Sequence, residues 1–328
     1  MPGTDESAPY VQKIDDAQKR ALVPAVKSYN NEAFLRSTQG RLIRILCEFE
    51  EPAARLRKNH IRSTVLLFGS ARSMTKEEHK AAMESRVTAL KSASDPQEKT
   101  RIETEMKRLR SIEWMCEWME RVTELSKRIA EFSLKEKELI NASFSRLPDY
   151  FRPSLSAVNK ETDVDAEAEA DLFHDLVVTT GGGPGFMEAA NKGASSVPGA
   201  LTMGMGISLP FEAGLNRYVT AGLAFTFHYF FTRKFWMMYS CRAIVIAPGG
   251  FGTMDEVFEL LTLRQTRKIP EFPIVLFCTK FWKTVVNWEA LAEFGTISKE
   301  EVDSLCFTDS VDEAVAFIRN FFVKNGAS

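Results

Sequence analysis

Two glycine-rich segments of the chain have the composition of anion-binding loops. The first is GGGPGFME, residues 181–188, and the second is PGGFGTMDE, residues 248–256. Glycine lets a backbone approach an anion closely, and a helix that starts after such a loop offers unpaired N–H groups and the positive end of its dipole. A tight strand-to-helix turn explains either loop alone equally well. The presence of two such loops favours phosphate binding.

Neither loop has the sequence of a common nucleotide-binding motif. The pattern GxxxxGK[ST] is absent, and the spacing in GGGPGF differs from GxGxxG. These differences argue against a P-loop ATPase and, less strongly, against an NAD enzyme. Thr253 stands where a helix N-cap is expected, so its hydroxyl has two candidate roles. It caps the helix, in a capping box with Glu256, or it bonds a phosphate oxygen.

A third candidate is the basic pair Arg233 and Lys234, within the aromatic segment HYFFTRKFW. Taken alone, Arg233 is more simply explained by a structural ion pair. The four histidines and five cysteines show neither metal-ligand spacing nor a CxxC pair. We therefore predict no metal site and no disulfide framework, which fits a reducing compartment.

These loops need a parallel sheet to position them. Apolar runs of strand length alternate with helical stretches, which predicts a Rossmann-like α/β fold with a doubly wound parallel sheet and added N-terminal and inserted helices. In such sheets ligands bind at the carboxyl ends of the strands. Strands are expected at 64–68, 176–180, 201–209, 243–247 and 274–277, and helices at 187–194, 227–239 and 254–266.

The remaining chain is rich in charge. Residues 1–62 are expected to form a helical extension, and residues 63–328 a nucleotide-binding catalytic domain with a charged helical insertion at about 73–171. Pro96 is the one helix breaker there, and two long amphipathic helices are predicted in the insertion, the second near residues 112–132. An apolar stripe that includes Trp114 and Trp118 is expected to cover the sheet or another subunit. The alternating acids of 163–171 are typical of a solvated linker.

Composition excludes several classes of protein. The 328 residues are 45% hydrophobic, which suffices for a large core, and their net charge is −2. No global charge therefore attracts nucleic acid or an anionic membrane. The N-terminus lacks an apolar signal region, and no apolar stretch reaches the roughly 18 residues that a membrane span needs. We expect a cytoplasmic protein.

Taken together, GGGPGFMEAANKGA, TRK and PGGFGTMDE resemble, in order and spacing, the LONELY GUY family of phosphoribohydrolases, long mislabelled as lysine decarboxylases. The stretches FGSAR, NRYVTAGLAFTFHYFFTRK and FELLTLRQTRKIPEFPIVLF look like the longer bacterial-type branch. The resemblance covers about 64–72 and 175–322. Residues from about 73 to 112 and from 135 to 171 match nothing in the short plant-type enzymes.

The resemblance implies hydrolysis of the N-glycosidic bond of a nucleoside 5′-monophosphate, AMP or a cytokinin riboside monophosphate, without metal or cofactor. Arg233 and Glu256 match the two positions regarded as catalytic, and Asp255 is one candidate for the acid that protonates the leaving base. The resemblance also implies a homodimer or larger homo-oligomer. Substrate-binding positions carried over are Ser70, Gly182, Gly183, Gly185, Met187, Lys234, Gly249, Gly250, Gly252 and Thr253.

Two other functions are compatible with glycine loops. A carrier of the same fold would bind a nucleotide or the molybdenum cofactor without hydrolysis, but the joint presence of Arg233 and Glu256 favours an enzyme. An amino-acid decarboxylase would need a lysine that holds pyridoxal phosphate, and Lys234 has no such constellation around it. Base preference, physiological role (hormone activation or nucleotide salvage), the insertion's role and oligomer size stay open.

Overall fold

The computed structural model of the chain describes residues 25–144, 173–208 and 214–326, which fall into two compact units, Met1–Cys47 and Glu48–Ser328. The first unit holds a short 3₁₀ turn, helix α1 (Glu32–Arg36) and the start of helix α2 (Arg41–Lys58). Its apolar side chains Phe34, Leu42 and Leu46 are exposed. The helices expected in this segment are therefore present, but these side chains enter no core.

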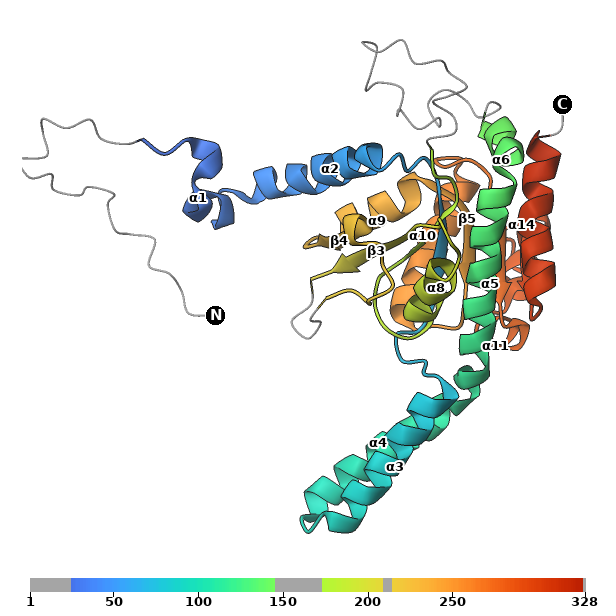
Figure 1. Cartoon of the computed structure of the whole chain (residues 1–328). Coiled ribbons are helices and arrows are strands. Elements are labelled where there is room, and N and C mark those ends of the chain that lie inside the picture. The colour runs from blue at the N-terminus through green and yellow to red at the C-terminus, as the bar shows by residue number, and fades with distance from the viewer. Residues whose placement is uncertain (1–24, 145–172, 209–213, 327–328) are drawn as a thin grey trace, which may run out of the picture. The chain divides into compact units, whose positions relative to one another are not determined.

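The second unit is built on seven parallel strands in the order β4-β3-β2-β1-β5-β6-β7 (Figure 1). The chain moves outward from β1 to β4, returns to the other side of β1 and moves outward again to β7. This arrangement confirms the predicted doubly wound α/β fold. The strands are β1 (Thr64–Phe68), β2 (Val177–Thr180), β3 (Thr202–Ile207), β4 (Ala224–Phe227), β5 (Cys241–Ile246), β6 (Ile274–Phe277) and β7 (Leu305–Thr308).

The order reverses between β1 and β5, and both strands end at the same level because Phe68 is paired with Ile246. A reversal of this kind leaves a crevice at the carboxyl ends of the two strands, where ligands bind in open α/β sheets. The loops after β1 and β5 are thus the first place to look for a functional site.

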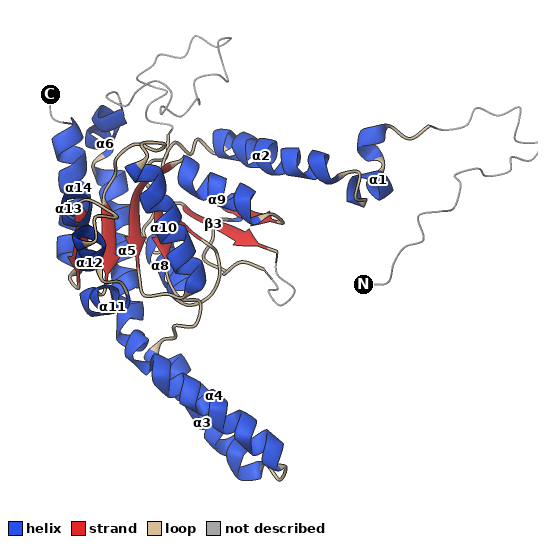
Figure 2. Cartoon of the chain, turned by 180° about the vertical axis from the view of Figure 1, so that it is seen from behind, coloured by secondary structure: helices blue, strands red, loops and turns tan. Residues whose placement is uncertain are grey.

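Alternate side chains of the central strand enter separate cores on the two faces of the sheet. Val65 and Leu67 pack with helices α5 (Cys116–Lys135), α8 (Phe186–Ser195) and α14 (Val311–Gly326). Leu66 and Phe68 pack with α9 (Phe230–Tyr239) and α10 (Phe251–Gln265). Because both faces are covered (Figure 2), a continuous apolar strand is stable here.

The long crossover from β1 to β2 contains more helices than predicted. Its described residues form α3 (Lys76–Ser92), α4 (Pro96–Ile112), a 3₁₀ turn (Glu113–Met115), α5 and α6 (Lys137–Phe144). Pro96 lies in the first turn of α4, where its missing N–H costs nothing, and α3 and α4 pack together as a hairpin (Figure 1). The second predicted helix, near 112–132, corresponds to α5, but the prediction of two helices is too few, and the 3₁₀ turn separates α5 from α4.

Helix α5 belongs to the core of the domain. Trp118, Val122 and Ile129 of its apolar stripe are buried, and α5 packs closely against α8. A side chain at Gly193 of α8 would collide with the Thr123 carbonyl of α5, so glycine permits this close approach. The stripe therefore covers the sheet, except at its N-terminal end, where Trp114 is 43% exposed.

Two strands were not predicted, β4 and β7. Both lie at the edges of the sheet, and both expose alternate or adjacent side chains, so neither is a continuous apolar run. The helix expected from residue 227 begins at Phe230, because Phe227 ends β4. The end of the expected strand at 209 and the acidic run 163–171 lie outside the described residues. Further short helices follow β6: α11 (Thr279–Val285), α12 (Trp288–Glu293) and α13 (Lys299–Asp303).

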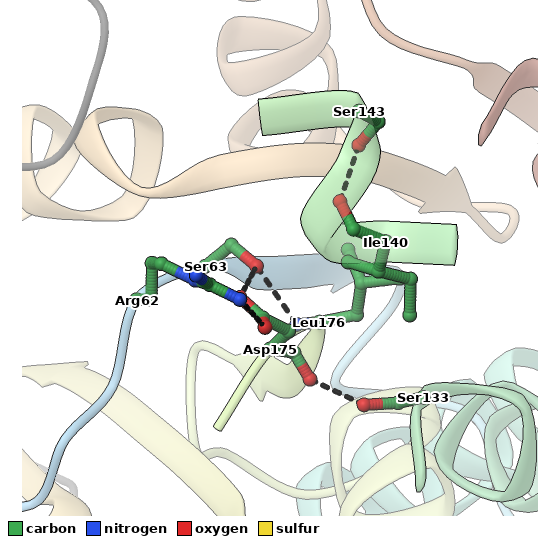
Figure 3. A network of polar contacts seen from close by, with 7 residues as sticks. All are labelled: Arg62, Ser63, Ser133, Ile140, Ser143, Asp175 and Leu176. Carbon is green, nitrogen blue, oxygen red and sulfur yellow. Dashed lines mark hydrogen bonds and ion pairs between the residues drawn. The ribbon is translucent and has the colours of Figure 1, made fainter. Parts of the chain in front are cut away.

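A polar network joins the amino ends of β1 and β2 to α5 (Figure 3). Arg62 forms an ion pair with Asp175, and the Ser63 hydroxyl donates to Asp175 Oδ1 over 2.9 Å. Ser63 Oγ also accepts from the Leu176 N–H, and Ser133 of α5 donates to the Asp175 carbonyl. This network holds the amino ends of β1 and β2 to α5, at the end of the sheet opposite the carboxyl ends of the strands.

Candidate active site

The loops after β1 and β5 lie side by side at the reversal of strand order. The Ser70 N–H donates to the Pro248 carbonyl over 2.9 Å, and the Ala247 N–H donates to the Phe68 carbonyl over 2.9 Å. A cavity of about 810 Å³ opens over both loops, a volume suited to a small organic ligand. The lining includes residues 68–72 and 248–254.

Arg233 of α9 and Glu256 of α10 meet on the wall of this cavity. Arg233 Nη1 lies 2.9 Å from Glu256 Oε1, and Arg233 Nε donates to the Met205 carbonyl of β3 over 2.8 Å. Both residues are 8% exposed and both line the cavity. Because the planar guanidinium is held at two of its nitrogens, the orientation of the ion pair is fixed.

Burial raises the pKa of Glu256, and this effect outweighs the charge and hydrogen bond of Arg233, which lower it. A carboxyl group with a raised pKa exchanges a proton nearer to neutral pH than an ordinary glutamate. Such a group on a cavity wall is typical of general acid or base catalysis.

The first glycine loop is held in place by side chains of the protein itself. Asn216 Nδ2 lies 3.1 Å from the Gly182 carbonyl, and the Gly182 N–H donates to Thr180 Oγ1 over 2.8 Å. Gly182 and Gly185 have φ angles of +73° and +70°, which favour glycine. A side chain at Gly183 would contact Met187. Packing thus accounts for these three glycines, and of the predicted binding residues on this loop only Met187 lines the cavity.

In the second glycine loop, packing within the chain does not account for every glycine. A Cβ at Gly249 would collide with the Thr253 side chain, whereas a Cβ at Gly250 or Gly252 would meet nothing within 4 Å. All four residues line the cavity. Contacts within the chain explain Gly249, but the space beside Gly250 and Gly252 is left open to the cavity.

Helix α10 begins at Phe251, with Gly250 as its N-cap and no side chain capping it. The expected N-cap at Thr253 and the capping box with Glu256 are therefore wrong. Thr253 lies in the first turn, and Glu256 pairs with Arg233. The first-turn N–H groups of α10 begin at the cavity floor, where a phosphate would find donors.

Lys234 does not line the cavity. Its Nζ lies 2.6 Å from Asp255 Oδ2 and 2.9 Å from Glu259 Oε2. Burial works to lower the pKa of Lys234, but these two carboxylates raise it overall, so the amine stays protonated. Asp255 is held in the same ion pair and is absent from the lining.

Sequence reasoning missed the apolar wall of the cavity. Ile112, Trp114 and Met115, around the 3₁₀ turn, line it together with Phe281 of α11. Trp114 and Phe281 stack with ring centroids 5.9 Å apart and planes 23° apart. The topology could have indicated this wall. A crossover helix such as α5 runs antiparallel to the strands, so it starts near their carboxyl ends. The residues just before α5 must therefore lie near the loops after β1 and β5.

No three His, Cys, Asp or Glu side chains among the described residues are grouped to hold a metal ion. Within 25–144, 173–208 and 214–326, no helix has the length and apolar character that crossing a membrane requires.

Comparison with known families gives one match. Residues 187–318 match the model of a family described as "Possible lysine decarboxylase". The matched segment contains the Arg233–Glu256 pair and the second glycine loop, and over these residues it agrees with the family resemblance seen in the sequence. No curated protein matches the chain.

Proposed function

We propose that the protein hydrolyses the N-glycosidic bond of a nucleoside 5′-monophosphate, from the cavity geometry and from the match of residues 187–318 to the possible lysine decarboxylase family. The products are a free base and ribose 5-phosphate, and AMP and cytokinin riboside monophosphates are the candidate substrates. One observation carries the proposal: a buried Arg233–Glu256 pair lies on the same cavity as an open glycine loop.

The phosphate is proposed to bind at the second glycine loop. The space beside Gly250 and Gly252 admits it, and the start of α10 offers N–H donors and a positive dipole end. Arg72, an exposed cation on the cavity lining, adds charge of the right sign. The phosphate is remote from the bond that breaks, and the free energy of binding it contributes to stabilising the transition state.

Cleavage of the bond between C1′ and the base leaves positive charge on the ribose. The Glu256 carboxylate stabilises this charge and takes a proton from water as the water oxygen bonds to C1′. The base leaves with the electron pair of the broken bond and takes up one proton from the solvent, and Glu256 releases the proton it took from water, so that protons balance over the reaction. Arg233 holds the carboxylate in place and remains charged throughout.

The family's label does not fit the cavity. Decarboxylation through pyridoxal phosphate needs a lysine that can form a Schiff base. None of the described lining residues is a lysine, and Lys234 is held between two carboxylates. We therefore derive no step through pyridoxal phosphate.

The test is to incubate the purified protein, without added metal or cofactor, with AMP, GMP, CMP and N6-isopentenyl-AMP, and to quantify base and ribose 5-phosphate by chromatography. Arg233→Lys and Glu256→Gln should lose the activity. Glu259→Gln is the matched control, because Glu259 lies on the same helix outside the cavity lining. Binding of AMP without release of base would instead indicate a carrier.

We further propose that the protein works as a homodimer or larger homo-oligomer in the cytoplasm. Phe230, Phe231 and Phe235 of α9 are exposed, and Phe251 at the start of α10 is 97% exposed. Large apolar side chains that gather on a surface are typical of a protein interface. The proposed location rests on the sequence, in which the five cysteines form no CxxC pair. Light scattering after size-exclusion chromatography tests the assembly.

A further inference from the structure

The helix that carries Arg233 begins beside a carboxylate from a distant part of the chain. Glu48 lies in α2, and its Oε1 accepts from the His228 N–H over 2.7 Å. Its Oε2 accepts from the Tyr229 N–H over 3.3 Å and also from the Thr232 hydroxyl. Three donors at the start of α9 therefore converge on one side chain.

Two further contacts hold the same helix to Glu48 and its neighbour. The indole N–H of Trp236 donates to the Glu48 carbonyl over 2.8 Å, and Phe49 packs edge-on against Phe235 with ring centroids 5.1 Å apart. Helix α9 has no capping side chain of its own, since Tyr229 is the N-cap and makes no side-chain cap. Glu48 supplies the missing cap, and a carboxylate is favourable at the positive end of the helix dipole.

A short path leads from this cap to the ion pair. The Tyr229 carbonyl accepts from the Arg233 N–H over 3.2 Å, which closes the first turn of α9. The guanidinium of Arg233 then reaches the Met205 carbonyl and Glu256. A shift at the start of α9 would therefore move the guanidinium relative to two fixed acceptors.

We infer that Glu48 is a positioning residue for Arg233: it anchors the start of α9 and thereby sets the geometry of the Arg233–Glu256 pair. This inference rests on the proposed function for the role of Arg233. It lies outside the segment that matches the family model, because Glu48 precedes residue 187. Glu48 does not line the cavity, and its hydrogen bonds go to α9 and to the two residues before it, so it acts through that helix.

The experiment compares Glu48→Gln, Glu48→Asp and Glu50→Gln in the full chain. Glu50→Gln removes the same charge from an exposed position on the same helix and is the matched control. Misplacement of a catalytic group by about 1 Å lowers the rate by up to about 100-fold. Glu48→Gln should therefore lower kcat by about 10-fold to 100-fold with a change in KM below about twofold. Glu48→Asp, which keeps the charge, should be intermediate.

Hydrogen exchange measured on residues 228–234 provides a readout independent of activity. Glu48→Gln should speed exchange there, while Glu50→Gln should not, and the unchanged thermal midpoint of Glu50→Gln confirms an intact fold. A folded Glu48→Gln protein with the kcat and exchange of the wild type overturns the inference. If the wild type releases no base, the proposed function fails, and faster exchange limited to the Glu48 variants still supports the anchoring of α9.

Discussion

A Cβ atom on Gly181 would lie 2.8 Å from Nη2 of Arg233 and 2.8 Å from Sδ of Met187. The first residue of the GGGPG segment therefore makes room for the guanidinium that pairs with Glu256. This relationship gives the first glycine loop a role in shaping the active site that does not depend on contact with phosphate.

We expect Gly181→Ala to lower kcat by more than about tenfold, because the new methyl group displaces the guanidinium or Met187.

Gly252→Ala should behave differently, since its Cβ has open space and alanine favours a helix by about 0.5–1 kcal/mol. Gly252→Ala should raise KM and leave the thermal midpoint unchanged or higher. Steady-state kinetics and thermal unfolding of both variants check this. Equal KM values for Gly252→Ala and wild type would contradict phosphate binding at this loop.

The ion pair should behave as a unit. Glu256→Gln removes a general base and should lower kcat by about 100-fold to 10,000-fold. Arg233→Lys should cost a comparable factor, because an ammonium group cannot reach Met205 and Glu256 at once. The double variant should be no slower than about the slower single variant, since residues that act together are not additive. Additive losses in the cycle would show that the two side chains act separately.

The raised pKa of Glu256 predicts the pH dependence of both activity and stability. If the carboxylate is the base, kcat/KM should rise with pH through a midpoint above the ordinary range of glutamate. The folded protein binds this proton more tightly than the unfolded chain does. The resulting contribution to stability is therefore complete below the pKa of the unfolded state and is lost as pH rises through the folded-state pKa.

Glu256→Gln should remove that contribution. The difference in unfolding free energy between wild type and Glu256→Gln should favour the wild type most at acid pH and decline as pH increases. Urea unfolding at a series of pH values measures this difference. Glu259→Gln serves as the control, and an identical slope for both variants would contradict the assignment to Glu256.

Trp114→Ala should weaken substrate binding more than catalysis. The exposed indole stacks on Phe281 and forms part of the apolar wall, and loss of such a surface costs about 1 kcal/mol, or roughly fivefold in KM. The KM values of AMP and N6-isopentenyl-AMP should both be compared. Trp118→Phe is the contrast, because Trp118 is buried against Phe277 and should alter stability while leaving KM unchanged.

Asp175→Ala should lower the free energy of unfolding and leave the catalytic activity unchanged. Removing one partner of a buried ion pair costs about 3–5 kcal/mol, and Asp175 also accepts the Ser63 hydroxyl. The network lies at the amino ends of the strands, away from the cavity lining. Chemical denaturation should show the loss, with KM unchanged in protein that remains folded. A changed KM would indicate coupling between the two edges of the sheet.

The parts of the fold that sequence predicts well are those with local signals. The expected strands 64–68 and 274–277 have the observed bounds, because both are buried on both faces and are apolar throughout. Edge strands β4 and β7 lack this pattern. Their existence depends on pairing with a neighbour distant in the chain.

The same distinction holds for the site. Glycine spacing is local and points to the second loop, whereas Arg233 and Glu256 were expected at one site only because they match the family's motif. The contacts of Gly181 with Arg233, of Glu48 with α9 and of Trp114 with Phe281 join segments far apart in sequence. Helix start points also depend on such contacts, which is why the N-cap of α10 is Gly250 rather than Thr253.

The central position of β1 has a consequence for biosynthesis. Its two neighbours are β2 and β5, and about half the chain separates it from β5. A nascent polypeptide therefore carries TVLLF as an unpaired apolar segment long before its second partner leaves the ribosome. Late pairing of β1 with β5 slows folding and leaves an apolar strand exposed to association with other chains. During synthesis, this five-residue segment therefore stays exposed on one side until β5 is complete.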